Sequence, residues 1–236
     1  MGSYRVFEPS FIWYAIGKIL PYIGVTFAVV ITTLIVSILF GALLARAKIR
    51  GKWGKVIADG YTAVFRCIPS IVLIYLVYYG LPQFVEHFTG VDINNWNKGI
   101  FIVLAFSLSF SAFISEIMRA AYDSVDAIQH EAALSIGLTE TQAFWRIIFP
   151  QAVRFALPNI ANIITSLMKE GALAYTIGLI DMMGAGKNII NMNYGSYTLE
   201  TYLGLFIIYW VLTKTIEILF AQIEKQLSKG RKTIAG

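Results

Sequence analysis

The chain has few of the residues from which catalytic and metal sites are usually built. Among its 236 residues there is one cysteine, and there are two histidines. The single cysteine, Cys67, excludes an internal disulfide framework and every zinc or haem pattern that needs several cysteines. No cluster of metal-ligating residues accompanies His87 or His130 in the sequence. We therefore expect no metal site on this chain.

Nucleotide-binding and hydrolytic motifs are missing as well. The nearest approach to a phosphate-binding loop is GAGKN at 184–188, where Asp181 replaces the first glycine and Asn188 replaces the serine or threonine. We interpret this segment as an external turn. Ser166 and Lys169 have the spacing of a Ser/Lys hydrolase, but nothing in the sequence supplies an oxyanion hole. The chain is predicted to have no catalytic or cofactor-binding residues and not to be an enzyme.

Charged residues make up only 14% of the chain, whereas hydrophobic residues make up 57%. Five segments are long and apolar enough to cross about 30 Å of hydrocarbon as helices. We place them at about 21–45, 62–81, 99–118, 155–180 and 199–220. The sequence therefore predicts an all-α polytopic membrane protein with about five transmembrane helices.

The spans define three parts of the chain. Residues 1–20 are predicted to be an N-terminal interfacial segment, with a short helix from about Phe11 to Leu20, because aromatic residues prefer the headgroup level. Residues 21–222 are the predicted transmembrane domain, and residues 223–236 are a basic tail.

The net charge of +5 is distributed between the apolar runs and not along one soluble face, which argues against a nucleic-acid partner. One side of the predicted membrane protein collects most of the basic residues, namely Arg46, Lys48, Arg50, Lys52, Lys55, Arg119, Arg146, Arg154, Lys225, Lys229, Arg231 and Lys232. The positive-inside rule places that side in the cytoplasm. We therefore expect the N-terminus outside and the C-terminus in the cytoplasm.

Residues 126–150 are predicted to form a cytoplasmic hairpin of two short amphipathic helices. Asp126 and Gln129 have the spacing of a capping box, which predicts a helix from about Ala127. Gly137 lies where a left-handed C-terminal cap would end that helix. Thr139 then repeats the capping spacing, and we expect Pro150 to close the second helix. A soluble hairpin inserted between membrane spans is a candidate contact with another subunit.

This hairpin resembles importer permeases of the ATP-binding-cassette class, which carry the pattern E-A-A-x3-G-x9-I-x-L-P. The matching residues are Glu131, Ala132, Ala133, Gly137, Ile147 and Pro150, and Phe149 replaces the usual leucine. Flanking segments are similar to the polar amino-acid permeases, the histidine, glutamine, arginine and cystine group. They are Glu116 to Arg119, Phe65 to Pro69 and Leu167 to Gly171, the last two departing from the family's R-G-T-P and L-K-D-T-S.

The resemblance implies the permease fold of a type I importer in a bacterial cell membrane. It also implies partners: ATPase subunits that hold ATP and Mg, an extracytoplasmic solute-binding protein and a second permease subunit, identical or related. The residues that it assigns to coupling with the ATPase are Glu131, Ala132, Ala133 and Gly137. Arg146 is a further candidate for that contact, with anionic lipid heads as its alternative. The expected substrate is a polar amino acid, with a lean toward cystine because of the departures near Glu170.

Lys169 and Glu170 interrupt the fourth predicted span. A charge within the bilayer costs about 2.5–3.5 kcal/mol on insertion scales, so the pair needs compensating partners or a water-filled path. Glu170 would pair with a solute ammonium and Lys169 with a carboxylate, and a structural ion pair or a kink is the alternative. Ser111 and Ser115 share one helix face and are candidates for the same path, with helix packing as their alternative.

An ATP-independent secondary transporter or channel for small polar solutes is the alternative function. Such proteins often carry inverted repeats with broken helices at corresponding positions. We find no such repeat, and the hairpin would have no purpose in a transporter of that kind.

Overall fold

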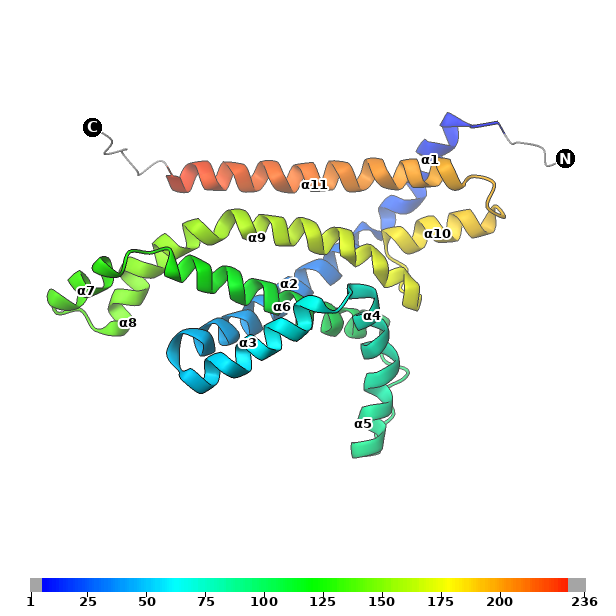
Figure 1. Cartoon of the computed structure of the whole chain (residues 1–236). Helices are drawn as coiled ribbons and strands as arrows, with labels where there is room; N and C mark the ends of the chain where they lie inside the picture. The colour runs from blue at the N-terminus through cyan, green and yellow to red at the C-terminus, as the bar shows by residue number, and fades with distance from the viewer. Residues whose placement is uncertain (1–5, 229–236) are drawn as a thin grey trace. The chain divides into compact units, whose positions relative to one another are not determined.

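The computed structural model describes residues 6–228, and this part of the chain contains helices and turns but no β-strand (Figure 1). The first half contains α1 (Pro9–Ile19), η1 (Leu20–Tyr22), α2 (Ile23–Arg50), α3 (Lys52–Cys67), α4 (Ser70–Tyr75), η2 (Leu76–Gly80), α5 (Leu81–Thr89) and α6 (Lys98–Asp123). The second half contains α7 (Ala127–Ser135), α8 (Glu140–Ala143), η3 (Phe144–Ile148), α9 (Phe149–Gly171), η4 (Ala172–Ile177), α10 (Met182–Met192) and α11 (Thr198–Ser228). Of the predicted basic tail, residues 229–236 lie outside the described range.

Five helical stretches among the described residues are long and apolar enough to cross a membrane, which confirms the predicted number. They are Pro9–Ile49, Ser70–Thr89, Lys98–Asp123, Glu140–Ile177 and Thr198–Leu227. The first takes in the predicted interfacial segment, since α1 continues through η1 into α2. The second begins at Ser70 and not at Thr62 as predicted. The reason is Pro69, whose preceding residue is driven out of the helical conformation, so that α3 ends at Cys67.

The chain divides into two compact units, each assembled from three stretches of sequence. Of the described residues, the first unit contains those up to Ile35, with Ile68–Ser107 and Ser166–Thr215. The second contains Val36–Cys67, Leu108–Thr165 and the described residues from Ile216 onward. Helices α2, α6, α9 and α11 each contribute one portion to either unit.

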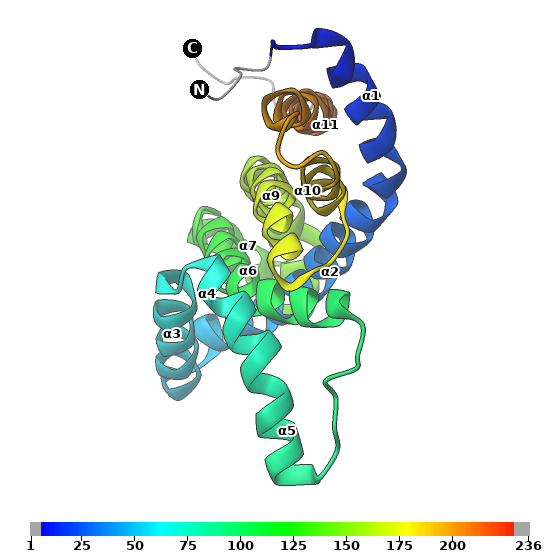
Figure 2. The same cartoon turned by 90° about the vertical axis from the view of Figure 1, so that its right-hand side faces the viewer.

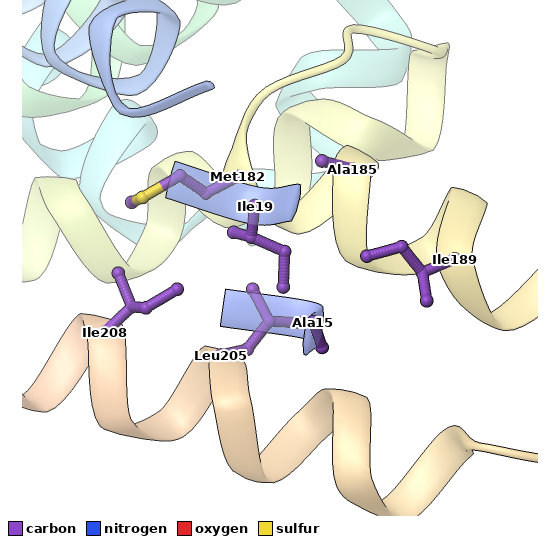
Figure 3. Packing of buried hydrophobic residues seen from close by; sticks show 7 residues of the cluster. All are labelled: Ala15, Ile19, Met182, Ala185, Ile189, Leu205 and Ile208. Carbon is purple, nitrogen blue, oxygen red and sulfur yellow. The ribbon is translucent and has the colours of Figure 1, made fainter. Parts of the chain in front are cut away.

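The core of the first unit lies where α1, α10 and α11 meet (Figures 2 and 3). Its buried side chains are those of Ala15, Ile19, Met182, Ala185, Ile189, Leu205 and Ile208. Gly186 allows the close approach of α10 to α11, because a Cβ atom there would lie 2.6 Å from Leu205 Cδ1. Small residues at such contacts are the usual means of packing helices in a membrane protein, where lipid supplies no hydrophobic driving force.

The prediction of an external turn at 184–188 is wrong, because this segment lies inside α10. Asp181 precedes the helix, and its carboxylate accepts a hydrogen bond from the Gly184 N–H at 2.9 Å. The glycines that suggested a turn are buried residues of a packed helix. Close packing against Leu205 explains why residue 186 is a glycine, and backbone flexibility is not needed to explain it.

In the second unit, the C-terminal part of α2 packs against α3 and α6, and α3 packs against α6. Tyr61 on α3 donates a hydrogen bond to the Leu108 carbonyl of α6 at 2.7 Å, and its ring contacts Phe40 of α2 edge-on. Gly41 of α2 faces Ile114 of α6, where a Cβ atom would lie 2.9 Å from Cγ2. These contacts give the hairpin that follows α6 a packed support within the same unit.

Candidate functional site

The first helix of the hairpin, α7, starts where the sequence predicts. Asp126 precedes it, and the Asp126 carboxylate accepts a hydrogen bond from the Ile128 N–H at 2.9 Å. The predicted capping box is wrong in its second half. The Gln129 amide is hydrogen-bonded to Gln151 at the start of α9, so it does not return to the cap. Gln129 thus joins α7 to the start of α9.

Gly137 ends α7 in the left-handed conformation, with φ of 88°, as predicted. The Gly137 N–H bonds to the Leu134 carbonyl at 2.9 Å, and the Leu138 N–H bonds to the Ala133 carbonyl at 3.2 Å. This pair of bonds is a Schellman motif, which satisfies carbonyls that the helix end would leave free. A Cβ atom on Gly137 would meet nothing within 4 Å, so the backbone conformation, and not space, is what favours glycine here.

The second helix opens with the predicted capping box. The Gln142 N–H bonds to Thr139 Oγ1 at 3.3 Å, and the Gln142 side chain accepts from the Thr139 N–H at 3.0 Å. His130 Nε2 and the Glu140 carboxylate lie 2.8 Å apart and link α7 to α8. Together the caps and this link fix the shape of the hairpin (Figure 1).

Pro150 does not close the second helix, contrary to the prediction. The chain passes from α8 through a π-helical turn, η3, directly into α9, which runs to Gly171. Pro150 has no N–H to donate, and it stands just after η3, where the regular i→i−4 bonding of the helix is already interrupted. The hairpin therefore leads directly into a membrane-length helix.

The outer surface of the hairpin is apolar at several positions. Ile136 is 77% exposed and Ile128 is 68% exposed, and Trp145 is also exposed. Four of the predicted coupling residues are exposed, namely Glu131, Ala132, Gly137 and Arg146. The fifth, Ala133, is buried and packs inside the hairpin.

Glu170 lies one residue before the end of α9, in the first unit. Its carboxylate accepts a hydrogen bond from the hydroxyl of Ser70, the first residue of α4. No cationic side chain among residues 6–228 forms an ion pair with Glu170. The neighbouring Lys169 is exposed, whereas Glu170 is partly buried, since adjacent helical residues point about 100° apart. An ion pair between these two neighbours is therefore not what holds Glu170.

Ser111 and Ser115 are both fully buried in the second unit. The Ser111 hydroxyl donates to the Leu108 carbonyl at 3.0 Å and lies 3.1 Å from the Tyr61 hydroxyl. The Ser115 hydroxyl donates to the Ala112 carbonyl at 2.8 Å. These local hydrogen bonds favour the packing alternative for both serines over contact with a solute.

Comparison with known proteins agrees with this arrangement of spans and hairpin. Residues 37–229 match the family model described as "Binding-protein-dependent transport system inner membrane component". The chain belongs to this permease family. It is a membrane-spanning permease subunit of an amino-acid ABC importer, and as such it is a transporter component and not an enzyme. This membership decides against the alternative of an ATP-independent transporter.

Individual permeases of this family are similar over most of the chain. The probable amino-acid permease protein YxeN of Bacillus subtilis is 40% identical over 173 residues, which cover 73% of this chain and 74% of that protein. The L-cystine transport system permease protein TcyL of the same organism is 34% identical over 232 residues, which cover 96% of each chain. The crystal structure of an amino acid ABC transporter with histidines matches with a TM-score of 0.80 at 30% identity, covering 94% of this chain and 99% of that one. The fold is that of a type I ABC importer permease.

Sequence reasoning about this permease missed two residues that the structure places at the centre of polar contacts. Ser70 is the hydrogen-bond donor to Glu170, and its position after Pro69 at a helix start was the only available signal. Lys48 was counted only as one of the cytoplasmic charges, yet its side chain is fully buried. Both assignments depend on partners more than 50 residues away along the chain, as the Lys48–Glu116 and Ser70–Glu170 pairs illustrate.

Proposed function

We propose that this permease carries a polar amino acid, with cystine as the favoured substrate, through a path that includes Glu170. The observation that carries the substrate proposal is the 34% identity to an L-cystine permease over 96% of both chains. Cystine has two α-ammonium and two α-carboxylate groups, so a permease for it needs acidic and basic contacts. Neighbouring Glu170 and Lys169 provide one group of each sign on α9.

Glu170 is the proposed contact for a solute ammonium. Its charge has only a neutral hydroxyl partner, Ser70, within the described part of the chain. An ionised carboxylate at membrane depth calls for a cation or for water. A passing ammonium group would supply that cation. Lys169 is the proposed contact for a carboxylate, and we leave Ser111 and Ser115 out of the path because their hydroxyls are bonded locally.

The hairpin is the proposed docking element for the ATPase subunits, which would bind ATP and Mg. Exposed apolar side chains on a water-facing helix pair, such as Ile136 and Ile128, favour a protein partner. Small residues at Ala132 and Gly137 would let the partner's surface close around α7. Closure of the ATPases would then move the hairpin, and through the unbroken η3–α9 connection the membrane helix as well.

A second permease subunit and an extracytoplasmic solute-binding protein complete the proposed assembly. Five spans form too small a wall to enclose a solute path well, so two copies or two related chains are needed. The excess of basic residues favours a cytoplasmic hairpin and C-terminus with an external N-terminus. The binding protein would then deliver the solute on the side opposite the hairpin.

Uptake into proteoliposomes tests the proposal. The permease is reconstituted with its ATPase and solute-binding protein, and uptake of labelled cystine is compared with that of arginine, glutamine and histidine. We expect ATP-dependent uptake of cystine, blocked by an excess of unlabelled cystine. Preferred uptake of one of the other amino acids would refute cystine as the substrate. Uptake without ATP would refute the proposed coupling of transport to ATP hydrolysis.

A further inference from the structure

Lys48 is a buried ammonium near the end of α2. Its side chain has no exposed surface, and it is held by partners from two other helices of the second unit. Lys48 Nζ donates to Thr62 Oγ1 of α3 at 3.0 Å and to the Glu116 carboxylate of α6. Asp59 of α3 lies 3.6 Å away. Lys48 thus joins α2, α3 and α6 through one charged atom.

The cluster continues along α6 toward the hairpin. Glu116 also accepts hydrogen bonds from Arg119, whose Nε and Nη2 lie 3.1 and 3.0 Å from its second carboxylate oxygen. Arg119 Nη1 in turn bonds to Asp123 at 2.7 Å. Asp123 is the last residue of α6, and only Ser124 and Val125 separate it from Asp126, the cap of α7. A continuous row of ion pairs therefore runs from Lys48 to the base of the hairpin.

A purely structural role explains this arrangement poorly. Taking an ammonium out of water is costly, and well-packed apolar residues of similar size are often at least as stabilising as a buried ion pair. Methionine would fill the space of Lys48 without that cost. What an ion pair adds is a directional link with one preferred geometry, which passes a displacement of one helix on to its neighbours.

We propose that Lys48 is a positioning residue that transmits movement of the hairpin to α2 and α3, an inference that rests on the proposed coupling function. When the hairpin moves, the end of α6 moves with it. Glu116 then pulls on Lys48 of α2 through their ion pair, and Lys48 pulls on Thr62 of α3 through its hydrogen bond, so that α2 and α3 move as well. The α3 helix ends at Cys67, and the chain then reaches Ser70, the partner of Glu170, after two residues.

The Lys48→Met variant tests this role in the assembled complex with its ATPase and solute-binding protein. Uptake and ATP hydrolysis are measured on the same proteoliposomes. We expect assembly and basal hydrolysis to persist, while the amount of solute carried per ATP falls about fivefold or more. Lys55→Met is the matched control, since it removes an equal charge from an exposed lysine of α3, and its transport ratio should equal that of the parent.

Two further variants separate positioning from stability. Lys48→Arg keeps the charge and should recover part of the ratio. Lys48→Met combined with Glu116→Gln leaves neither partner of the buried pair charged, so it should regain thermal stability but not the ratio of uptake to hydrolysis. This double variant also replaces Lys48→Met in the test if Lys48→Met alone does not insert into the membrane.

A parental ratio in Lys48→Met, or recovery of the ratio in the double variant, would overturn the inference. A parental complex that takes up no amino acid with ATP would instead refute the proposed function.

Discussion

The Ser70 hydroxyl donates a hydrogen bond to the Glu170 carboxylate, although 100 positions separate the two residues in the chain. The contact joins the start of α4, which is also the start of the second span, to the end of α9. Pro69 separates α3 from α4, which begins at Ser70. A 3-10 turn, η4, follows Glu170 and Gly171. An ionised side chain at membrane depth calls for a cation or a water-filled path, and Ser70 supplies only a neutral donor.

Replacing Glu170 with glutamine should therefore impair transport without impairing assembly. Glutamine keeps the size of the side chain and still accepts the Ser70 hydrogen bond, but it removes the charge that would pair with a solute ammonium. Loss of such a charged contact costs about 1–3 kcal/mol, which is about a 5- to 150-fold loss of uptake efficiency. Stimulation of ATP hydrolysis by the loaded binding protein should largely survive. Uptake kinetics and hydrolysis in proteoliposomes measure both effects.

Two neighbouring substitutions serve as controls for Glu170. Ser70→Ala removes only the neutral donor, so its effect on uptake should be smaller than that of Glu170→Gln. Lys169→Gln removes the adjacent, exposed charge and should weaken recognition of the carboxylate and not of the ammonium. A decarboxylated substrate analogue distinguishes the two, because only its ammonium can bind. Normal uptake by Glu170→Gln would return this residue to a structural role.

Gly137 should be sensitive to substitution in an order set by backbone conformation. Its φ of 88° is accessible to glycine, tolerable for asparagine and unfavourable for a β-branched residue, at a cost of about 1–2 kcal/mol. A Cβ atom there has free space, so crowding within the chain does not contribute. We expect binding-protein-stimulated ATP hydrolysis to decrease in the order Gly, Asn, Ala, Val while the permease still inserts. Equal stimulation in Gly137→Val and the parent would remove Gly137 from the coupling element.

The features that could be predicted from the sequence are those that depend on neighbouring residues. The Thr139 capping box and the left-handed Gly137 are local, and each needs only the chemistry of a few adjacent positions. The five spans are also local, because an apolar run of sufficient length has few alternatives to a membrane helix.

The features that could not be predicted depend on partners far along the chain. Gln129 has the spacing for a capping box, but Gln151 competes for its amide. The segment 184–188 looked like a turn because the sequence does not show that Leu205 packs against Gly186. The burial of Lys48 follows from Thr62 and Glu116, neither of which marks itself as a partner in the sequence.

Asp181 should make the stability of the permease depend on pH. Burial raises the pKa of its carboxyl from 3.8 to about 6, against the opposing effect of hydrogen bonds from the backbone of Gly184 and from Thr26. Because the folded pKa lies above the unfolded one, this group's contribution is most favourable below about pH 4 and is lost as the pH rises to about 6. The loss is at most about 3 kcal/mol for a shift of about two pKa units.

The Asp181→Asn variant isolates that contribution. Asparagine keeps an oxygen that accepts the Gly184 N–H bond, but it cannot ionise. Its apparent melting temperature in detergent should therefore change less than that of the parent between pH 4 and 6, and at pH 7 it should equal or exceed the parental value. Identical pH profiles of variant and parent would show that Asp181 does not titrate there.

Asn94 and Gln226 should be accessible to a thiol reagent from opposite sides of the membrane. Single cysteines at Asn94, in the exposed turn between α5 and α6, and at Gln226, near the end of α11, are introduced into a Cys67→Ala background. The positive-inside argument predicts that an impermeant thiol reagent labels Asn94→Cys from outside and Gln226→Cys only after the cells are opened. A cysteine at the exposed Ile136 of the hairpin should label like Gln226→Cys and should lose that labelling when the ATPase is bound. Labelling of Asn94→Cys and Gln226→Cys from the same side would contradict five spans, and labelling of Ile136→Cys from outside would place the hairpin where no cytoplasmic ATPase could reach it.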